Sequence, residues 1–139
     1  MYKRQEVACA VALANLEIME RENLVGRVKD DVGPYLAKRF AELNDHPLVG
    51  VAETCGFTAG LVLVKNKLTK ERFNPDLSVG MVCRGHCFGN GLIMRAVGDR
   101  MIIAPPLTMT HAQIDEMMEL IKKCLDFTYA DVRKNGWLA

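Results

Sequence analysis

Two strand-like stretches, each divided by a turn signal, restrict the possible folds of this 139-residue chain more than any other feature does. The first covers residues 48–64, is rich in apolar and β-branched residues, and is divided near Gly56. The second consists of residues 92–95 and 101–104, which stand on either side of a turn at Gly98. Because short turns join antiparallel neighbours, both stretches predict hairpins within an antiparallel sheet.

Segments with helical periodicity surround these hairpins. Apolar residues recur at helical spacing over residues 7–18, 24–43 and 110–132, and residues 79–88 predict a shorter helix. The second pattern should be kinked or broken at Pro34, because proline has no amide hydrogen for a helical hydrogen bond. This order of elements predicts an α+β domain, in which the helices pack on one face of an antiparallel sheet.

The length and composition allow one domain. Apolar residues make up 50% of the chain and charged residues 25%, which is typical of a globular protein rather than a disordered one. Residues 1–5 have no pattern that joins them to the rest, so we interpret them as an unstructured terminal scar or artefact and assign the domain to residues 6–139. The polar residues 66–78 predict an exposed loop within this domain.

Charge and cysteine content argue against several partners. The formal net charge is +1, and no basic patch for nucleic acid or an anionic membrane is present. No apolar stretch approaches the roughly 20 residues that a spanning helix needs, so no membrane association is expected. Five cysteines are scattered along the chain: Cys9, Cys55, Cys83, Cys87 and Cys124. Their odd number and the lack of a secretory signal favour reduced thiols in a cytoplasmic protein.

One cluster contains part of a possible metal site. Cys83, His86 and Cys87 form a C-x-x-H-C sequence, with soft ligands at close spacing. Zinc normally needs a fourth ligand, and only the isolated Cys55 or His46 is available. Cysteines packed on a short helix are therefore the favoured interpretation, and no metal site is predicted. No pairing of a cysteine or serine with a histidine singles out a nucleophile.

Arg95 has two interpretations. The predicted strand places it on the same face as Ile93, at the strand end just before the turn. An arginine in such a place is more often half of a surface ion pair than a ligand-binding group. A planar guanidinium can also hold a carboxylate through two parallel hydrogen bonds, so the spacing alone leaves both roles open.

The carboxy-terminal motif resembles the end of class III aminotransferases. It comprises Asn-Gly-Leu-Ile-Met-Arg-Ala-Val-Gly-Asp at residues 90–99 and Ile-Ile-Ala-Pro-Pro-Leu at residues 102–107. The likeness begins at residues 7–15, Val-Ala-Cys-Ala-Val-Ala-Leu-Ala-Asn, and covers nearly the whole chain. It is strongest for the branch that uses pyruvate with putrescine, β-alanine or other amines.

The resemblance implies the small C-terminal domain of a homodimeric, fold-type I enzyme that depends on pyridoxal 5'-phosphate. In that family the lysine that binds the cofactor lies upstream, so no catalytic or cofactor-binding residue is expected here. Lys65, Lys67 and Lys70 lie in the polar loop, where nothing would desolvate them. The family's arginine, which falls on Arg95, binds the carboxylate of the keto acid or amino acid and swings aside for uncharged amines.

The implied reaction transfers an amino group from an amine, diamine or omega-amino acid to pyruvate or another 2-oxo acid. This fragment alone should be inactive, because the catalytic lysine is missing. The alternative is a free-standing α+β module for ligand binding or regulation, without catalysis. Apolar exposure distinguishes the two, since a severed domain should expose the helix over residues 7–18 where its parent covered it.

Overall fold

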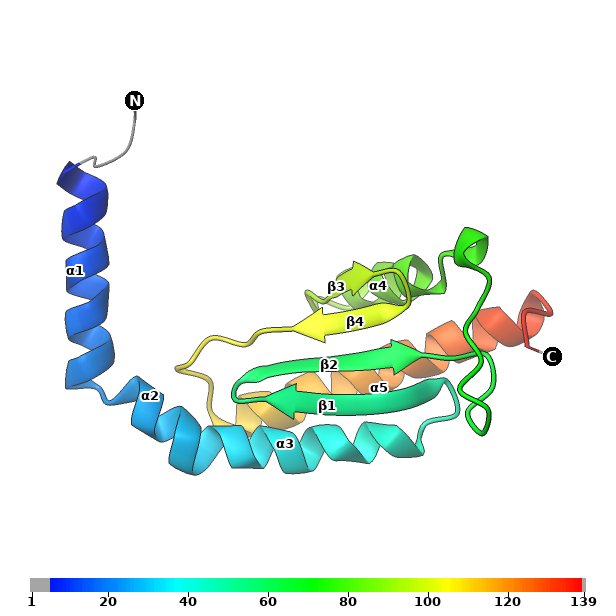
Figure 1. Ribbon diagram of the computed structural model, residues 1–139, viewed down its shortest axis with the longest axis horizontal. Helices are drawn as coiled ribbons and strands as arrows, with labels where there is room; N and C mark the ends of the chain where they lie inside the picture. The colour runs from blue at the N-terminus through cyan, green and yellow to red at the C-terminus, as the bar shows by residue number, and fades with distance from the viewer. Residues whose placement is uncertain (1–5, 139) are drawn as a thin grey trace.

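The computed structural model describes residues 6–138, and the predicted scar at residues 1–5 lies outside the described residues. The chain folds into one sheet with helices packed along it, and the first helix extends away from the sheet (Figure 1). The α-helices are α1 (Glu6–Arg21), α2 (Leu24–Arg27), α3 (Gly33–Ala41), α4 (Val79–Gly89) and α5 (His111–Lys134). The strands are β1 (Val49–Cys55), β2 (Thr58–Leu63), β3 (Arg95–Val97) and β4 (Arg100–Ile103). Shorter helical turns are η1 (Val28–Val32), η2 (Glu42–Asp45) and η3 (Pro75–Leu77).

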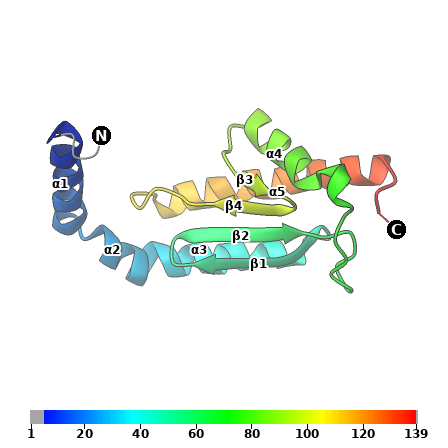
Figure 2. The same cartoon turned by 45° about the horizontal axis from the view of Figure 1, so that its top comes forward.

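The sheet confirms the predicted architecture. Its strands follow the order β1-β2-β4-β3, and every neighbouring pair is antiparallel. Helices α3 and α5 lie along one face, and α4 packs beside α5 near the β3 edge (Figures 1 and 2). Side chains alternate accordingly, so Leu61 and Met101 are buried beneath the helices whereas Val62 and Ile102 are only half-buried on the opposite, open face.

The expected break at Pro34 takes the form of a π-helical turn. Residues of η1 connect α2 to α3 without leaving the helical path, and the Gly33 amide donates to the Val28 carbonyl five residues earlier. This wider turn accommodates a residue that has no amide hydrogen of its own. A side chain at Gly33 would collide with the backbone, because its Cβ would lie 2.2 Å from the Val28 oxygen.

The second hairpin is shorter than the sequence predicted. Residues 92–94 are not part of the sheet, and β3 begins only at Arg95. Its partner β4 starts at Arg100 and ends at Ile103, just before an Ala-Pro-Pro sequence. Because proline cannot donate to a ladder, strand pairing stops there, and the Leu92 amide donates instead to the Cys87 carbonyl at 2.9 Å.

Helix α4 approaches the turn of this hairpin closely. A Cβ added at Gly80 would lie 2.0 Å from the Gly98 carbonyl oxygen, so only glycine permits this contact. Gly85 belongs to the same helix but is exposed, with nothing within 4 Å of an added Cβ. The two glycines therefore differ in packing and share the same helical context.

Substituting each glycine with alanine should have opposite effects on the free energy of unfolding of this chain. Gly85→Ala should stabilise it by about 0.5–1 kcal/mol, because alanine favours the helix. Gly80→Ala should destabilise it by about 1–3 kcal/mol, because overpacking forces α4 away from the turn. Urea denaturation followed by circular dichroism measures both effects, and a stabilising Gly80→Ala would contradict the close approach.

Within residues 6–138, no helix is both long and apolar enough to cross a membrane.

Candidate functional site

Arg95 lies on the open face of the sheet, at the start of edge strand β3. Along this segment Met94 is buried and Ala96 packs against the core, whereas Ile93, Arg95 and Val97 are exposed. Arg95 therefore shares a face with Ile93, as expected. The expectation that it ends the strand just before the turn is wrong, because β3 continues to Val97.

The surroundings of Arg95 on the open face are apolar. Ile102 of β4 is its partner across the strand pair, and Gly60 of β2 is the next partner beyond Ile102. Among residues 6–138, no carboxylate forms an ion pair with Arg95 and no acceptor forms a hydrogen bond with its side chain. The interpretation as a surface ion pair therefore lacks an acidic partner in this part of the chain, and the guanidinium donors of Arg95 remain available for a ligand.

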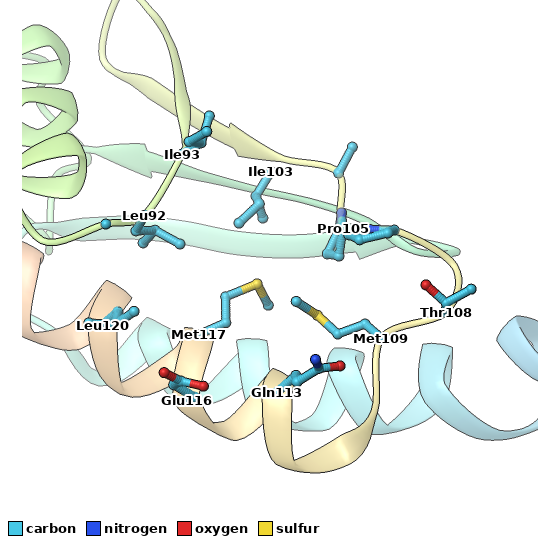
Figure 3. Close-up of a pocket in the computed structure, with 13 residues that line it drawn as sticks. Leu92, Ile93, Ile103, Pro105, Thr108, Met109, Gln113, Glu116, Met117 and Leu120 are labelled. Carbon is cyan, nitrogen blue, oxygen red and sulfur yellow. The ribbon is translucent and has the colours of Figure 1, made fainter.

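A cavity of about 520 Å³ opens beside this site, between the end of the second hairpin and α5 (Figure 3). Its wall is mainly apolar and includes Ile93, Pro105 and Met117. Of residues 6–138, Glu116 is the one charged residue that lines the cavity, and Arg95 does not line it. A ligand carboxylate would be repelled by Glu116, so this cavity does not suit the binding of a carboxylate.

The C-x-x-H-C cluster is divided between two environments. Cys83 and Cys87 are buried, whereas the Nε2 atom of His86 lies 2.7 Å from Asp131 Oδ2 of α5. A hydrogen bond to Cys83, together with burial, raises the pKa of the Cys87 thiol. Within the described part of the chain, no three His, Cys, Asp or Glu side chains are placed to hold a metal ion. Cys83 and Cys87 therefore pack in the core, as predicted for cysteines on a short helix.

The lysines of the described residues do not fit covalent attachment of an aldehyde cofactor. None is buried, and the loop residues Lys67 and Lys70 are exposed, as the sequence predicted. Lys65 was expected to be equally solvated but is half-buried, and its ammonium lies 3.4 Å from the Glu71 carboxylate. The half-buried Lys122 lies 3.1 Å from Glu42, and this hydrogen bond raises the pKa of its ammonium group. A nucleophilic lysine needs the opposite shift, produced by desolvation or a neighbouring cation.

The fold and the position of Arg95 can be compared with known proteins. The sequence model of the family described as "Aminotransferase class-III" matches residues 2–125, which is most of the chain. The chain belongs to the class III aminotransferases. The matched residues include both hairpins and most of α5, so the family assignment covers the Arg95 segment and the elements that support it.

This chain spans less than a third of the length of three similar proteins. The putrescine–pyruvate aminotransferase of Pseudomonas aeruginosa is 57% identical over 131 residues, which are 94% of this chain and 28% of that protein. The diaminobutyrate–2-oxoglutarate transaminase of Halomonas elongata is 34% identical over 90% of this chain and 27% of its own length. The solved omega-transferase of Vibrio fluvialis is 33% identical with a TM-score of 0.86, covering 92% of this chain and 30% of that one.

The sequence singled out Arg95 but not the residues that lie beside it on the open face. Val97 and Ile102 flank Arg95 on the open face because of strand alternation and antiparallel register. The period-two pattern of residues 92–97 contained this signal for Val97. Placing Ile102 also required the register of the hairpin, which depends on where the turn begins.

Proposed function

We propose that this chain is the C-terminal small domain of a pyridoxal-phosphate-dependent omega-aminotransferase. The parent transfers an amino group from an amine, diamine or omega-amino acid to pyruvate or another 2-oxo acid. The observation that carries the proposal is the exposed guanidinium of Arg95, which has no partner among residues 6–138 and lies within a 57% identical match to a putrescine–pyruvate aminotransferase.

Arg95 binds the carboxylate of the acceptor in this proposal. Its planar fork can donate two parallel hydrogen bonds to the two carboxylate oxygens, which also fixes the orientation of the acceptor. The apolar neighbours Val97 and Ile102 limit the competition from water on one side. Since Arg95 is exposed and β3 is an edge strand, its side chain has room to move aside for an amine without a carboxylate.

Pyridoxal phosphate supplies the electron-withdrawing chemistry of transamination when it is bound. The described lysines do not fit its covalent attachment, so the proposal places the cofactor lysine in the part of the enzyme outside this chain. What this chain contributes is the orientation of the acceptor through Arg95. The catalytic residues belong to the remaining part of the parent.

The exposure of α1 supports a severed domain over a free-standing module. This helix extends away from the sheet, and none of its residues is buried (Figures 1 and 2). Val7 is 76% exposed, and other large apolar residues of the helix are also exposed: Val11, Leu13, Leu16 and Ile18. A module that folds alone normally buries such a helix. We propose that an upstream part of the enzyme covers it.

The remaining parts of the proposal concern the whole enzyme. We propose that the parent is a homodimer in the cytoplasm, acts on small amines and 2-oxo acids, and does not bind nucleic acid or a membrane. All five cysteines of the chain are free, which is consistent with a reducing compartment.

A chimeric enzyme tests the proposed function. Residues 6–138 of this chain would replace the matching C-terminal segment of the Pseudomonas relative, which is 28% of that protein. The chimera should transaminate pyruvate with putrescine, whereas the relative truncated before this segment should not. A chimera that folds and binds the cofactor but does not transaminate would contradict the proposal and favour the module.

A further inference from the structure

The strand that carries Arg95 has little support from the sheet itself. Strand β3 has three residues, and within the described part of the chain its one neighbouring strand is β4, with which it forms three residue pairs. Edge strands of this length are weakly held by their ladder alone. The position of Arg95 therefore depends on contacts that β3 and its flanking residues make outside the sheet.

Helix α4 holds both ends of the segment that contains Arg95. At one end, the Leu92 amide donates to the Cys87 carbonyl near the C-terminus of α4, at 2.9 Å. At the other end, the Gly80 amide in the first turn of α4 donates to the Asp99 carboxylate, at 3.1 Å. The helix spans the segment from start to turn and connects to it by a hydrogen bond at each end.

Asp99 connects three elements at once. Its carboxylate bonds to α4, its carbonyl accepts a hydrogen bond from the Leu63 amide of β2 at 2.8 Å, and it directly precedes β4. The contact with α4 is close, because a Cβ on Gly80 would lie 2.0 Å from the Gly98 oxygen. A carboxylate beside the first turn of a helix is also stabilised by the helix dipole.

We infer that Asp99 is a positioning residue for the binding of the acceptor carboxylate by Arg95. This inference rests on the proposed function. Without the Asp99 carboxylate, the Gly80 amide loses its acceptor and the turn end of the hairpin is released from α4. Bidentate binding requires a placement within roughly 0.5 Å, so a released edge strand presents Arg95 poorly to a 2-oxo acid. An acceptor without a carboxylate does not depend on that placement.

The test compares Asp99→Ala with the unmodified chimera on pyruvate and on a neutral aldehyde such as butanal. Asp99→Ala should lower kcat/KM for pyruvate roughly tenfold, mainly through KM, because misplacement of a binding group is costly. The value for butanal should change less than about twofold. Asp99→Asn should fall between, because its amide oxygen can still accept from Gly80. As a control, Asp76→Ala removes an exposed aspartate from η3 and should leave kcat/KM unchanged for both pyruvate and butanal.

A double-mutant comparison separates this inference from the proposed function. In an Arg95→Ala chimera, adding Asp99→Ala should lower kcat/KM for pyruvate by less than about a further twofold, because the group that Asp99 positions is already absent. Equal losses for pyruvate and butanal, or no loss for pyruvate, would overturn the positioning role while leaving a selective effect of Arg95→Ala intact. If Asp99→Ala does not fold, Asp99→Asn decides, and the absence of a selective rise in its KM for pyruvate overturns the inference. An Arg95→Ala variant without selectivity would instead count against the role of Arg95 in the proposed function.

Discussion

Replacing Arg95 with alanine in the chimeric enzyme should reduce kcat/KM for pyruvate about 10- to 100-fold, because a charge-assisted hydrogen-bonded pair contributes roughly 1.5–3 kcal/mol. The same substitution should leave a neutral aldehyde almost unaffected, since butanal offers no carboxylate to the guanidinium. The half-reaction with putrescine should also change little, because this donor has no carboxylate. Steady-state kinetics with each acceptor, and single-turnover measurements with putrescine, provide the comparison.

Two further variants distinguish direct binding from the removal of charge. Arg95→Lys should recover only part of the activity with pyruvate, because an ammonium keeps the attraction but loses the planar fork. Arg100→Ala removes an arginine from β4 of the same hairpin, on the open face opposite Val97. Its effect on pyruvate should stay below about threefold, because exposed charges without direct contact are screened by water and salt. Equal losses of pyruvate and butanal activity in folded Arg95→Ala would reduce Arg95 to a structural residue.

The sequence predicted the parts of the fold that depend on local chemistry. The helix predicted over residues 110–132 is α5, which begins at His111 directly after its N-cap Thr110, and the Thr110 side chain forms a capping box with Gln113. The turn at Gly56, which has a φ of 59°, joins β1 to β2 as the strand pattern indicated. These features could be predicted because neighbouring residues determine them, through side-chain capping and through the positive φ that glycine tolerates.

Contacts between segments that are distant in the sequence could not be predicted in the same way. Gly80 and Asp99 are 19 residues apart, and no periodicity relates an amide in a helix to a carboxylate in a turn. The start of β3 at Arg95 was missed for a similar reason. Pairing before Arg95 would require β4 to continue beyond Ile103 towards the two prolines that follow it. Arg95 itself was selected by resemblance to a family. Spacing alone favoured a surface ion pair, and choosing between the two roles required knowing which side chains lie around Arg95.

The isolated chain should neither transaminate pyruvate nor form a site-specific, borohydride-reducible adduct with pyridoxal phosphate. An ordinary lysine with a pKa near 10.4 has only about one neutral amine in a thousand or more at pH 7, so it attacks an aldehyde weakly. Catalytic lysines overcome this through desolvation or a neighbouring cation. In this chain, Lys122 and Lys65 are instead paired with glutamates, and the pKa of Lys122 is raised. Labelling should therefore be weak and distributed over several lysines.

Mass spectrometry of the reduced peptides distinguishes distributed from site-specific labelling. The chimera is the positive control, and its adduct should lie on one lysine in the segment from the Pseudomonas relative. In a Lys122→Gln variant of the isolated chain, the labelling pattern should be unchanged apart from the loss of that one residue. A stoichiometric adduct on a single lysine of the isolated chain, accompanied by turnover of pyruvate and an amine, would mean that the cofactor site lies within these 139 residues. That result would also contradict the proposal that this domain only orients the acceptor, because the lysine that holds the cofactor must lie within reach of the acceptor that Arg95 binds.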